Sequence, residues 1–416
     1  MNVDARAARR PVLALLGLLL AVPLLLPFSR AAELPVLAGA LCALLFVRDR
    51  AALAGAPAHA LLAGLGAYAL AALLSAFDAA APGKSWATTL ASLRLLAFGL
   101  GTLALVELAL AQGASRHWLR TRVAWMAALP VALWTLDALV QGLTGHSLGG
   151  TLDADRLSGI FGADDLKLGP LLPTLAPLLL WPLLAAPRWL LALAWLALLA
   201  VVLLAGARAG WVSYALVGAA LAWRLAGGSK RRFLAWTGAA LLLMAVGMGA
   251  AYQASGQFRA RVDRTLAAFG GDYDLALAGR VPIWRTALRM AADHPVNGVG
   301  VRGFRHAYPA YADADDPWVD PVTGTGAAHG HQIVLELLTE TGTLGLLLWS
   351  WAALRLWRLA RAGDVDPAAQ APWIALGVLL FPLNTHLAFY SSFMGIVLAW
   401  LLALACVQAR LGEVKA

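Results

Sequence analysis

The sequence predicts an all-α polytopic membrane protein with about twelve transmembrane helices and one large extramembrane loop. Of its 416 residues, 61% are hydrophobic and only 13% are charged, and the mean hydropathy is +0.73. A compact soluble fold cannot hide so much apolar surface, whereas each helix that crosses a bilayer takes up roughly 20 apolar residues. The composition therefore excludes a soluble enzyme, a disordered chain, a coiled coil and a disulfide scaffold.

The apolar runs have the length that a bilayer-spanning helix needs. Hydropathy places them at residues 11–28, 32–47, 53–76, 88–111, 122–143, 169–186, 189–206, 210–226, 233–252, 332–354, 372–389 and 392–409. The first run follows several arginines but lacks a clean small-residue cleavage site, so we expect an anchor rather than a signal peptide. Cys42 and Cys406 lie inside apolar runs, where neither a disulfide nor a zinc site is expected.

The order of the basic residues predicts the topology. The net charge of +9 does not favour nucleic acid binding, because the basic residues are scattered between apolar runs. If the N-terminus is cytoplasmic, 18 of the 32 arginines and lysines lie at cytoplasmic ends: three precede the first run, and the others fall in alternate connections at residues 48–50, 116–122, 188, 224–232, 355–361 and 410–415. The positive-inside rule then places both termini in the cytoplasm.

Two short connections on the opposite side break this charge rule. The first holds Lys84, with Arg94 just inside the following span. The second, residues 144–168, holds Arg156 and Lys167. We therefore consider these residues as candidates for binding an anionic ligand.

The third exception is the long segment 253–330, which contains eight arginines and eight aspartates. It is the only stretch long enough for an extramembrane domain, and it divides the chain into helices 1–9 (1–252), the loop (253–330) and helices 10–12 with a tail (331–416). Helical spacing at 257–269 and 281–292 predicts two short helices in the loop. No G-x-x-x-x-G-K-[ST] nucleotide loop occurs, so an ATP-driven pump is not supported.

Arg208 lies in the tight junction Ala205-Gly206-Ala207-Arg208-Ala209-Gly210 between two apolar spans. The topology puts this junction at the outer membrane surface, where an arginine opposes the charge rule. One interpretation is a snorkelling side chain on a lipid phosphate. The other is a fixed cation for an anionic headgroup, because a guanidinium binds phosphate oxygens bidentately.

Arg280 opens the helix predicted over 281–292, where its guanidinium and the free N–H groups of the first turn can face the same anion. Arg285 and Arg289 follow at a spacing of one turn. Salt bridges to the aspartates of the loop are the simpler explanation for these two. Arg280 is therefore the stronger candidate.

His331 stands at the outer end of the tenth span. The positive end of the helix dipole disfavours imidazolium there, which suits a general base, although a structural hydrogen bond to a carbonyl is the simpler explanation for such a histidine. His329 raises the alternative of a metal pair, but the spacing is weak. Glu336 and Glu340 are carboxylates within a span, and such groups pair with arginines or support a functional residue.

The aspartates Asp313, Asp315, Asp316 and Asp320 carry oxygen ligands for a divalent cation. They lack the regular spacing of a calcium loop. A solvated acidic loop is the simpler interpretation, and we predict no metal site.

Several short motifs occur in a fixed order: Arg208 beside Gly210, Gly279-Arg280 with Trp284, His294-Pro295 followed by Gly298, Gly300 and Phe304, and His331-Gln332-x-x-Leu335 followed by Gly342. With the multi-span topology and the single large loop, they resemble the bacterial O-antigen ligases of the O-antigen ligase and polymerase superfamily. The likeness covers most of the chain. The segment Arg156–Gly162 is similar to a further family element, although Ala163-Asp164-Asp165 departs from the more usual Asn-Pro.

The resemblance implies a GT-C-like inner-membrane enzyme whose loop and active site face the periplasm. It implies an inverting, metal-independent glycosyltransferase without a cofactor, whose donor is an O-antigen polysaccharide on undecaprenyl pyrophosphate and whose acceptor is a sugar hydroxyl of lipid A-core. Arg208 and Arg280 would bind the pyrophosphate, and His331 would deprotonate or orient the acceptor hydroxyl. Further contacts to the substrates or to membrane lipid are expected from Lys84, Arg94, Arg156, Arg285, Arg289, Arg302 and His329.

Two other functions fit the same pattern of spans. A polymerase of the superfamily would use the same donor site but take a second lipid-linked glycan as its acceptor. A transporter of lipid-linked glycans would explain twelve spans without any chemistry, but it would be expected to carry polar residues near the bilayer midplane. Arg208, Arg280 and His331 instead map to one outer rim.

Overall fold

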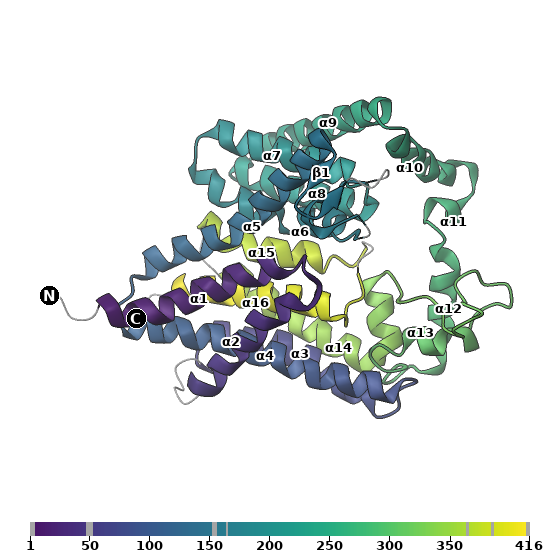
Figure 1. Cartoon of the computed structure of the whole chain (residues 1–416), viewed down its shortest axis with the longest axis horizontal. Coiled ribbons are helices and arrows are strands. Elements are labelled where there is room, and N and C mark those ends of the chain that lie inside the picture. Colours follow the sequence, from purple (N-terminus) through teal and green to yellow (C-terminus); the bar gives the residue numbers. More distant parts are fainter. Residues whose placement is uncertain are drawn as a thin grey trace. The chain divides into compact units, whose positions relative to one another are not determined.

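The structure is a computed structural model that describes residues 5–46, 53–151, 156–163, 165–362, 366–383 and 387–412. The charges predicted to be cytoplasmic at Arg48, Arg50 and Lys415, and Asp164 of the 163–165 turn, lie outside the described residues. Helices dominate the fold (Figure 1). The strands in the described ranges form one two-stranded antiparallel hairpin, β1 (His146–Ser147) with β2 (Gly150–Thr151).

Every predicted span coincides at least in part with a helix. Among the described residues, seven helical segments are long and apolar enough to cross a membrane: Ala56–Ala76 (α3), Pro82–Ala111 (α4), Arg116–Thr144 (α5), Leu168–Ala185 (α6 with a 3-10 turn), Lys230–Ala254 (α9), Ile333–Ala362 (α14) and Ser392–Gly412 (α16). The other predicted spans fall on α1 (Ala5–Leu25), α2 (Glu33–Phe46), α7 (Arg188–Leu204), α8 (Arg208–Ala226) and α15 (Pro367–Leu379). The fold is therefore an all-α multi-pass membrane protein, and a total of twelve spans stays a prediction.

Two predicted spans differ from the helices found by more than a shift of their ends. In the described part of the run predicted at 372–389, the helix ends at Leu379, because Leu380 leaves the helical conformation and Pro382 follows. The tenth predicted span, 332–354, is longer and is interrupted: α14 extends to Ala362 and is broken at Gly342 (φ 64°, ψ −168°).

The two short helices predicted in the long loop are confirmed. They are α10 (Gly256–Leu266) and α12 (Arg280–Asp293), with the single turns α11 (Tyr273–Ala276) and α13 (Phe304–Ala307) beside them. The second half of the loop has its own apolar core, in which Ile283 and Met290 of α12 pack with Phe304 and Tyr308. This part of the loop is therefore a folded structure.

The chain divides into two compact units. Unit 1 comprises Met1–Val123, Leu277–Val365 and Thr385–Ala416, and unit 2 comprises Ala124–Ala276 and Asp366–Asn384. Each unit combines segments that are far apart in the sequence. Each is described by itself below.

Unit 1 is built around α16, in which residues 394–408 are all buried (Figure 1). This helix packs against α1, α3 and α4. Trp400 donates its indole N–H to the Leu19 carbonyl oxygen at 2.9 Å. Small residues let other helices of the unit approach closely, since a Cβ on Gly101 of α4 would overlap the Gly39 carbonyl of α2.

In unit 2, α8 packs against α6 and α9. Tyr214 of α8 stacks on Trp195 of α7, with ring centroids 4.4 Å apart, and donates its hydroxyl to the Trp195 carbonyl oxygen at 2.7 Å. Helix α9 differs from its neighbours because only Met244 and Ala251 are buried, although its sequence is strongly apolar. A helix that presents apolar side chains outward in this way is suited to contact lipid.

Candidate functional site

Arg208 is the first residue of α8 and is partly buried. Its Nη1 donates to the carbonyl oxygen of Ala276 in α11 and, at 3.2 Å, to the hydroxyl of Thr265 in α10. These two bonds tie the end of an apolar helix to the first half of the long loop. The guanidinium is therefore held in one orientation before any ligand binds.

Other arginines of unit 2 gather around Arg208. Burial lowers the pKa of Arg208, and the positive charges of Arg264 and Arg156 lower it further, which places both of them near its guanidinium. Arg261 packs on the junction before α8, where Gly206 (φ 66°) leaves room that a Cβ would take from the guanidinium. Such a cluster of like charges is stabilised when an anion binds in it.

Arg156 was among the sequence candidates, whereas Arg261 and Arg264 were not. Both belong to α10. Arg261 lies three residues after the buried Phe258 and is only 5% exposed, whereas Arg264 is exposed and no spacing in the sequence marks it. The sequence candidate Lys167 forms an ion pair with Asp165. The segment that follows Arg156 is fixed by Gln141, whose side-chain oxygen accepts the N–H groups of Ser158 and Gly159 at 2.9 and 2.8 Å.

Arg280 begins α12 in unit 1, as the sequence predicts. Gly279 before it adopts φ 73°, and its carbonyl oxygen accepts the indole N–H of Trp318 at 2.6 Å. The Nη1 atom of Arg280 reaches the Leu277 carbonyl oxygen at 3.4 Å. The residue therefore stands at the N-terminus of a 14-residue helix, where the first-turn N–H groups and the helix dipole favour an anion.

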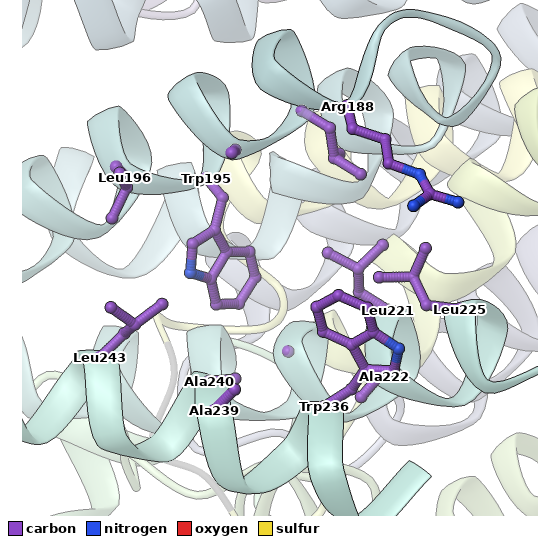
Figure 2. Close-up of a pocket in the computed structure, with 13 residues that line it drawn as sticks. Arg188, Trp195, Leu196, Leu221, Ala222, Leu225, Trp236, Ala239, Ala240 and Leu243 are labelled. Atoms are coloured by element: carbon purple, nitrogen blue, oxygen red, sulfur yellow. The ribbon is translucent and has the colours of Figure 1, made fainter. Parts of the chain in front are cut away.

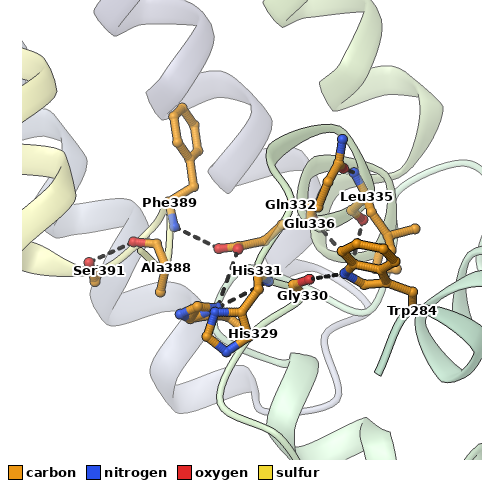
Figure 3. A network of polar contacts seen from close by, with 11 residues as sticks. Trp284, His329, Gly330, His331, Gln332, Leu335, Glu336, Ala388, Phe389 and Ser391 are labelled. Atoms are coloured by element: carbon orange, nitrogen blue, oxygen red, sulfur yellow. Dashed lines mark hydrogen bonds and ion pairs between the residues drawn. The ribbon is translucent and has the colours of Figure 1, made fainter. Parts of the chain in front are cut away.

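The two histidines lie side by side just before α14 (Figure 3). The backbone N–H of His331 donates to Nδ1 of His329 at 3.2 Å, and the ring centroids are 3.8 Å apart. The same Nδ1 lies 4.0 Å from Oε2 of Glu336. His329 is thus oriented between a backbone donor and a buried carboxylate.

Glu336 connects this pair to the rest of unit 1. It is 1% exposed, and its Oε1 accepts the N–H of Phe389 at 2.6 Å. Gln332 caps α14, because its side-chain oxygen accepts the N–H of Leu335 at 2.6 Å, and Trp284 of α12 donates to the Gly330 carbonyl oxygen at 3.0 Å (Figure 3). The segment 329–332 is therefore held from both sides.

Backbone strain occurs beside the predicted site residues. Within the described ranges, the non-glycine residues with positive φ are Ala278 (59°), Arg302 (63°) and His331 (53°). Each such conformation costs about 1–3 kcal/mol and persists where the surroundings enforce it, which is common at functional sites. Arg302 and His331 are themselves sequence candidates, and Ala278 is two residues before Arg280.

The glycine motif of the loop attaches it to the break in α14. Pro295 and Val296 accept the N–H groups of Thr343 and Leu344 at 2.8 and 3.1 Å, directly after Gly342. The Val299 N–H donates to the Thr339 carbonyl oxygen at 2.8 Å. The break in α14 thus leaves backbone N–H and carbonyl groups free to form hydrogen bonds with the loop. We call this contact between residues 295–299 and 339–344 the loop clamp.

The other side of the same loop segment is bound to α3 and α4. Ser85 donates its hydroxyl to the Val301 carbonyl oxygen at 2.8 Å, and the Val301 N–H donates to Ser75 at 3.3 Å. Gly300 (φ 87°) comes so close to Ala79 that no side chain fits there. Arg302 follows directly, so its strained backbone is fixed by the bundle.

Lys84 and Arg302 both act electrostatically on His306. Burial lowers the pKa of His306, and the charges of Lys84, Arg305 and Arg302 lower it further. The structure thus brings together two sequence candidates that are more than two hundred positions apart in the chain. Their shared neighbourhood is positively charged.

Arg302 and Arg94 line a cavity of about 230 Å³ in unit 1, together with Tyr68 and Tyr390. Arg94 is already matched in charge, because its Nε and Nη2 donate to the Glu33 carboxylate at 2.8 and 2.5 Å. Arg94 therefore lines the cavity, but its positive charge is already balanced by the Glu33 carboxylate.

Arg285 and Arg289 form ion pairs with Asp313, at 3.6 and 2.8 Å. This arrangement agrees with the simpler of the two sequence interpretations. The other acidic residues also stabilise the loop: Asp316 accepts the Tyr308 hydroxyl, and Asp320 accepts the Thr323 hydroxyl, both at 2.8 Å. In the ranges that the structure covers, no three His, Cys, Asp or Glu side chains are placed to hold a metal ion.

Comparison with known proteins agrees with the motifs. Residues 192–350 match the family model described as O-antigen ligase. The matched stretch contains Arg208, Arg280, His331 and the loop clamp. No curated protein matches the chain. The match is to a stretch that covers less than half of the chain, and it agrees with the resemblance that the motifs indicate.

Proposed function

We propose, from the match of residues 192–350 to the O-antigen ligase family, that this protein is an O-antigen ligase of the bacterial inner membrane. It transfers a polysaccharide from undecaprenyl pyrophosphate to a sugar hydroxyl of lipid A-core and so completes lipopolysaccharide. The loop 253–330 and the active site face the periplasm, and both termini are cytoplasmic. This orientation follows from the distribution of basic residues.

In this proposal the arginines bind the donor. Arg208, with Arg156, Arg261 and Arg264 around it, and Arg280 at the start of α12 offer planar guanidinium groups to the pyrophosphate oxygens. Negative charge grows on the pyrophosphate as its bond to the sugar breaks. Fixed cations stabilise that charge more in the transition state than in the ground state, and this difference accelerates the reaction.

His331 acts on the acceptor in the same proposal. The acceptor hydroxyl oxygen attacks the anomeric carbon, the bond from that carbon to the pyrophosphate oxygen breaks, and the hydroxyl proton passes to the imidazole. Attack from the face opposite the leaving group inverts the anomeric configuration. Pyrophosphate leaves with the bonding electron pair, and no metal or cofactor takes part.

The structural observation that supports the role of His331 is its strained backbone. A non-glycine residue is kept at φ 53° by contacts from His329, Gln332 and Trp284, at the N-terminus of α14. The general principle is that strain of about 1–3 kcal/mol is retained where it aims a side chain for function.

The test is glycan transfer by the purified full-length protein. Undecaprenyl-pyrophosphate-linked glycan is supplied either with lipid A-core or with a second lipid-linked glycan, each in the presence and absence of EDTA. We expect transfer to lipid A-core that is unaffected by EDTA. Elongation of the lipid-linked glycan alone would instead identify a polymerase, and loss of transfer in EDTA that a divalent ion restores would overturn the metal-independent mechanism.

A further inference from the structure

An apolar groove of about 410 Å³ lies within unit 2, between α7, α8 and α9 (Figure 2). Trp195 forms one wall and Trp236 another, and the small side chains of Ala222 and Ala240 leave the space between the helices open. Its volume lies in the range of pockets that bind small molecules, roughly 300–1,000 Å³. Arg188 is its one charged lining residue.

Positive charge is concentrated at one end of these three helices. Arg188 begins α7, Arg224 lies in the last turn of α8, and Lys230, Arg231 and Arg232 begin α9. Because consecutive helices run in opposite directions, these termini share one side of the membrane. No acidic residue occurs in the sequence from 188 to 254, so this stretch as a whole carries a net positive charge.

The same end carries tryptophans that suit a membrane interface. Trp189, Trp223 and Trp236 are 64%, 60% and 47% exposed and stand beside or within two turns of the basic residues. Indole rings gather at the headgroup level of a bilayer, so this end of the groove lies at that level. The groove extends from there along the apolar parts of the helices.

Arg188 is available for a ligand. It is exposed, and among the residues that the structure describes none forms a hydrogen bond or ion pair with it. Its side chain extends over Leu221 and Leu225 of α8 at the rim of the groove (Figure 2). A guanidinium above an apolar slot is complementary to a molecule with an anionic head and a hydrocarbon tail.

We propose that this groove binds an anionic glycerophospholipid of the bilayer, with one acyl chain between α7, α8 and α9 and its phosphate on Arg188. Basic pockets between transmembrane helices on the cytoplasmic side recognise anionic lipid headgroups, which are attracted there by charge. The positive-inside rule puts the Arg188 end on that side.

This lipid site is separate from the proposed donor site. Arg208 lies beyond the opposite end of α7, and a 17-residue helix is about 25 Å long. The polyprenyl pyrophosphate of the donor therefore belongs to the other membrane surface. A glycerophospholipid of the cytoplasmic leaflet is the occupant that fits both the charge and the position.

Native mass spectrometry of the full-length protein in detergent tests the proposal. The probes are phosphatidylglycerol and phosphatidylethanolamine with the same acyl chains, and undecaprenyl phosphate. We expect the protein to retain phosphatidylglycerol in preference. Arg188→Gln should weaken that binding about fivefold, the contribution of one basic residue near an anionic headgroup, and Arg188→Lys should retain most of it.

Matched controls distinguish a site from general attraction. Arg231→Gln removes the same charge outside the groove, and Ala235→Leu adds the same bulk on α9 outside the lining, whereas Ala240→Leu fills the groove and should weaken binding of both phospholipids. Equal losses in Arg188→Gln and Arg231→Gln would overturn the proposal. So would unchanged binding in Ala240→Leu, or displacement of phosphatidylglycerol by equimolar undecaprenyl phosphate.

Discussion

Replacing Gly342 by alanine should release the loop from α14. At φ 64° and ψ −168°, Gly342 occupies a region that is essentially restricted to glycine, so a side chain there costs about 1–3 kcal/mol. The new Cβ would also overlap the Val296 carbonyl oxygen and lie 2.5 Å from the Asn297 nitrogen. The loop must then move, and the two hydrogen bonds from Thr343 and Leu344 contribute roughly 0.5–1.5 kcal/mol each.

The expected destabilisation by Gly342→Ala is therefore about 2–6 kcal/mol. Thermal unfolding of the purified protein in detergent measures it, and Tm should fall by roughly 2–7 °C, since the entropy of unfolding is about 2.1 cal/mol/K per residue. Gly66→Ala is the matched control, because Gly66 lies in α3 of the same unit and nothing is within 4 Å of its added Cβ. That variant should be neutral or stabilised by up to about 1 kcal/mol. Equal Tm values for the two variants would refute the reasoning.

Three further predictions concern the proposed site. Arg208→Lys should lower glycan transfer at least about tenfold without loss of membrane abundance, since lysine keeps the charge but loses the planar fork, and Arg231→Lys should leave transfer unchanged. His331→Ala should lower transfer by roughly 100-fold. His331→Gly should be equally inactive but should have a higher Tm than His331→Ala, because glycine adopts φ 53° without strain. Near-normal transfer by a folded His331→Ala protein would exclude His331 as the general base. With both native cysteines replaced, Asp315→Cys should react with a membrane-impermeant maleimide in intact cells and Arg231→Cys only after permeabilisation, and the reverse pattern would invert the topology.

Much of the architecture could be predicted because a bilayer imposes a simple rule on sequence. Spans and the helices at 256–266 and 280–293 follow from apolar length and helical spacing. The early end of α15 was missed because hydropathy continues through Pro382, and only the conformational restriction of proline indicates the stop.

The residues that surround each site residue were harder to predict than the site residues themselves. The motifs identified Arg208, Arg280 and His331, but the approach of Arg264 to Arg208 and of Lys84 and Arg302 to His306 depends on tertiary packing. Glu336 and Arg94 show the same limit: the sequence indicates a charge within a span, and only the fold supplies the Phe389 N–H or the Glu33 carboxylate beside it. Partners so far apart in the chain leave no periodic signal.

The burial of α16 has a consequence for biosynthesis. Translation delivers this helix after every other part of unit 1, yet it fills the space between α1, α3 and α4, and its Arg410 pairs with Glu107, 303 positions earlier. Until the ribosome has released that segment, the earlier helices have no partner for these faces. Unit 1 of a nascent chain therefore stays incompletely packed in the membrane until α16 inserts. During that interval the chain is exposed to quality-control proteases.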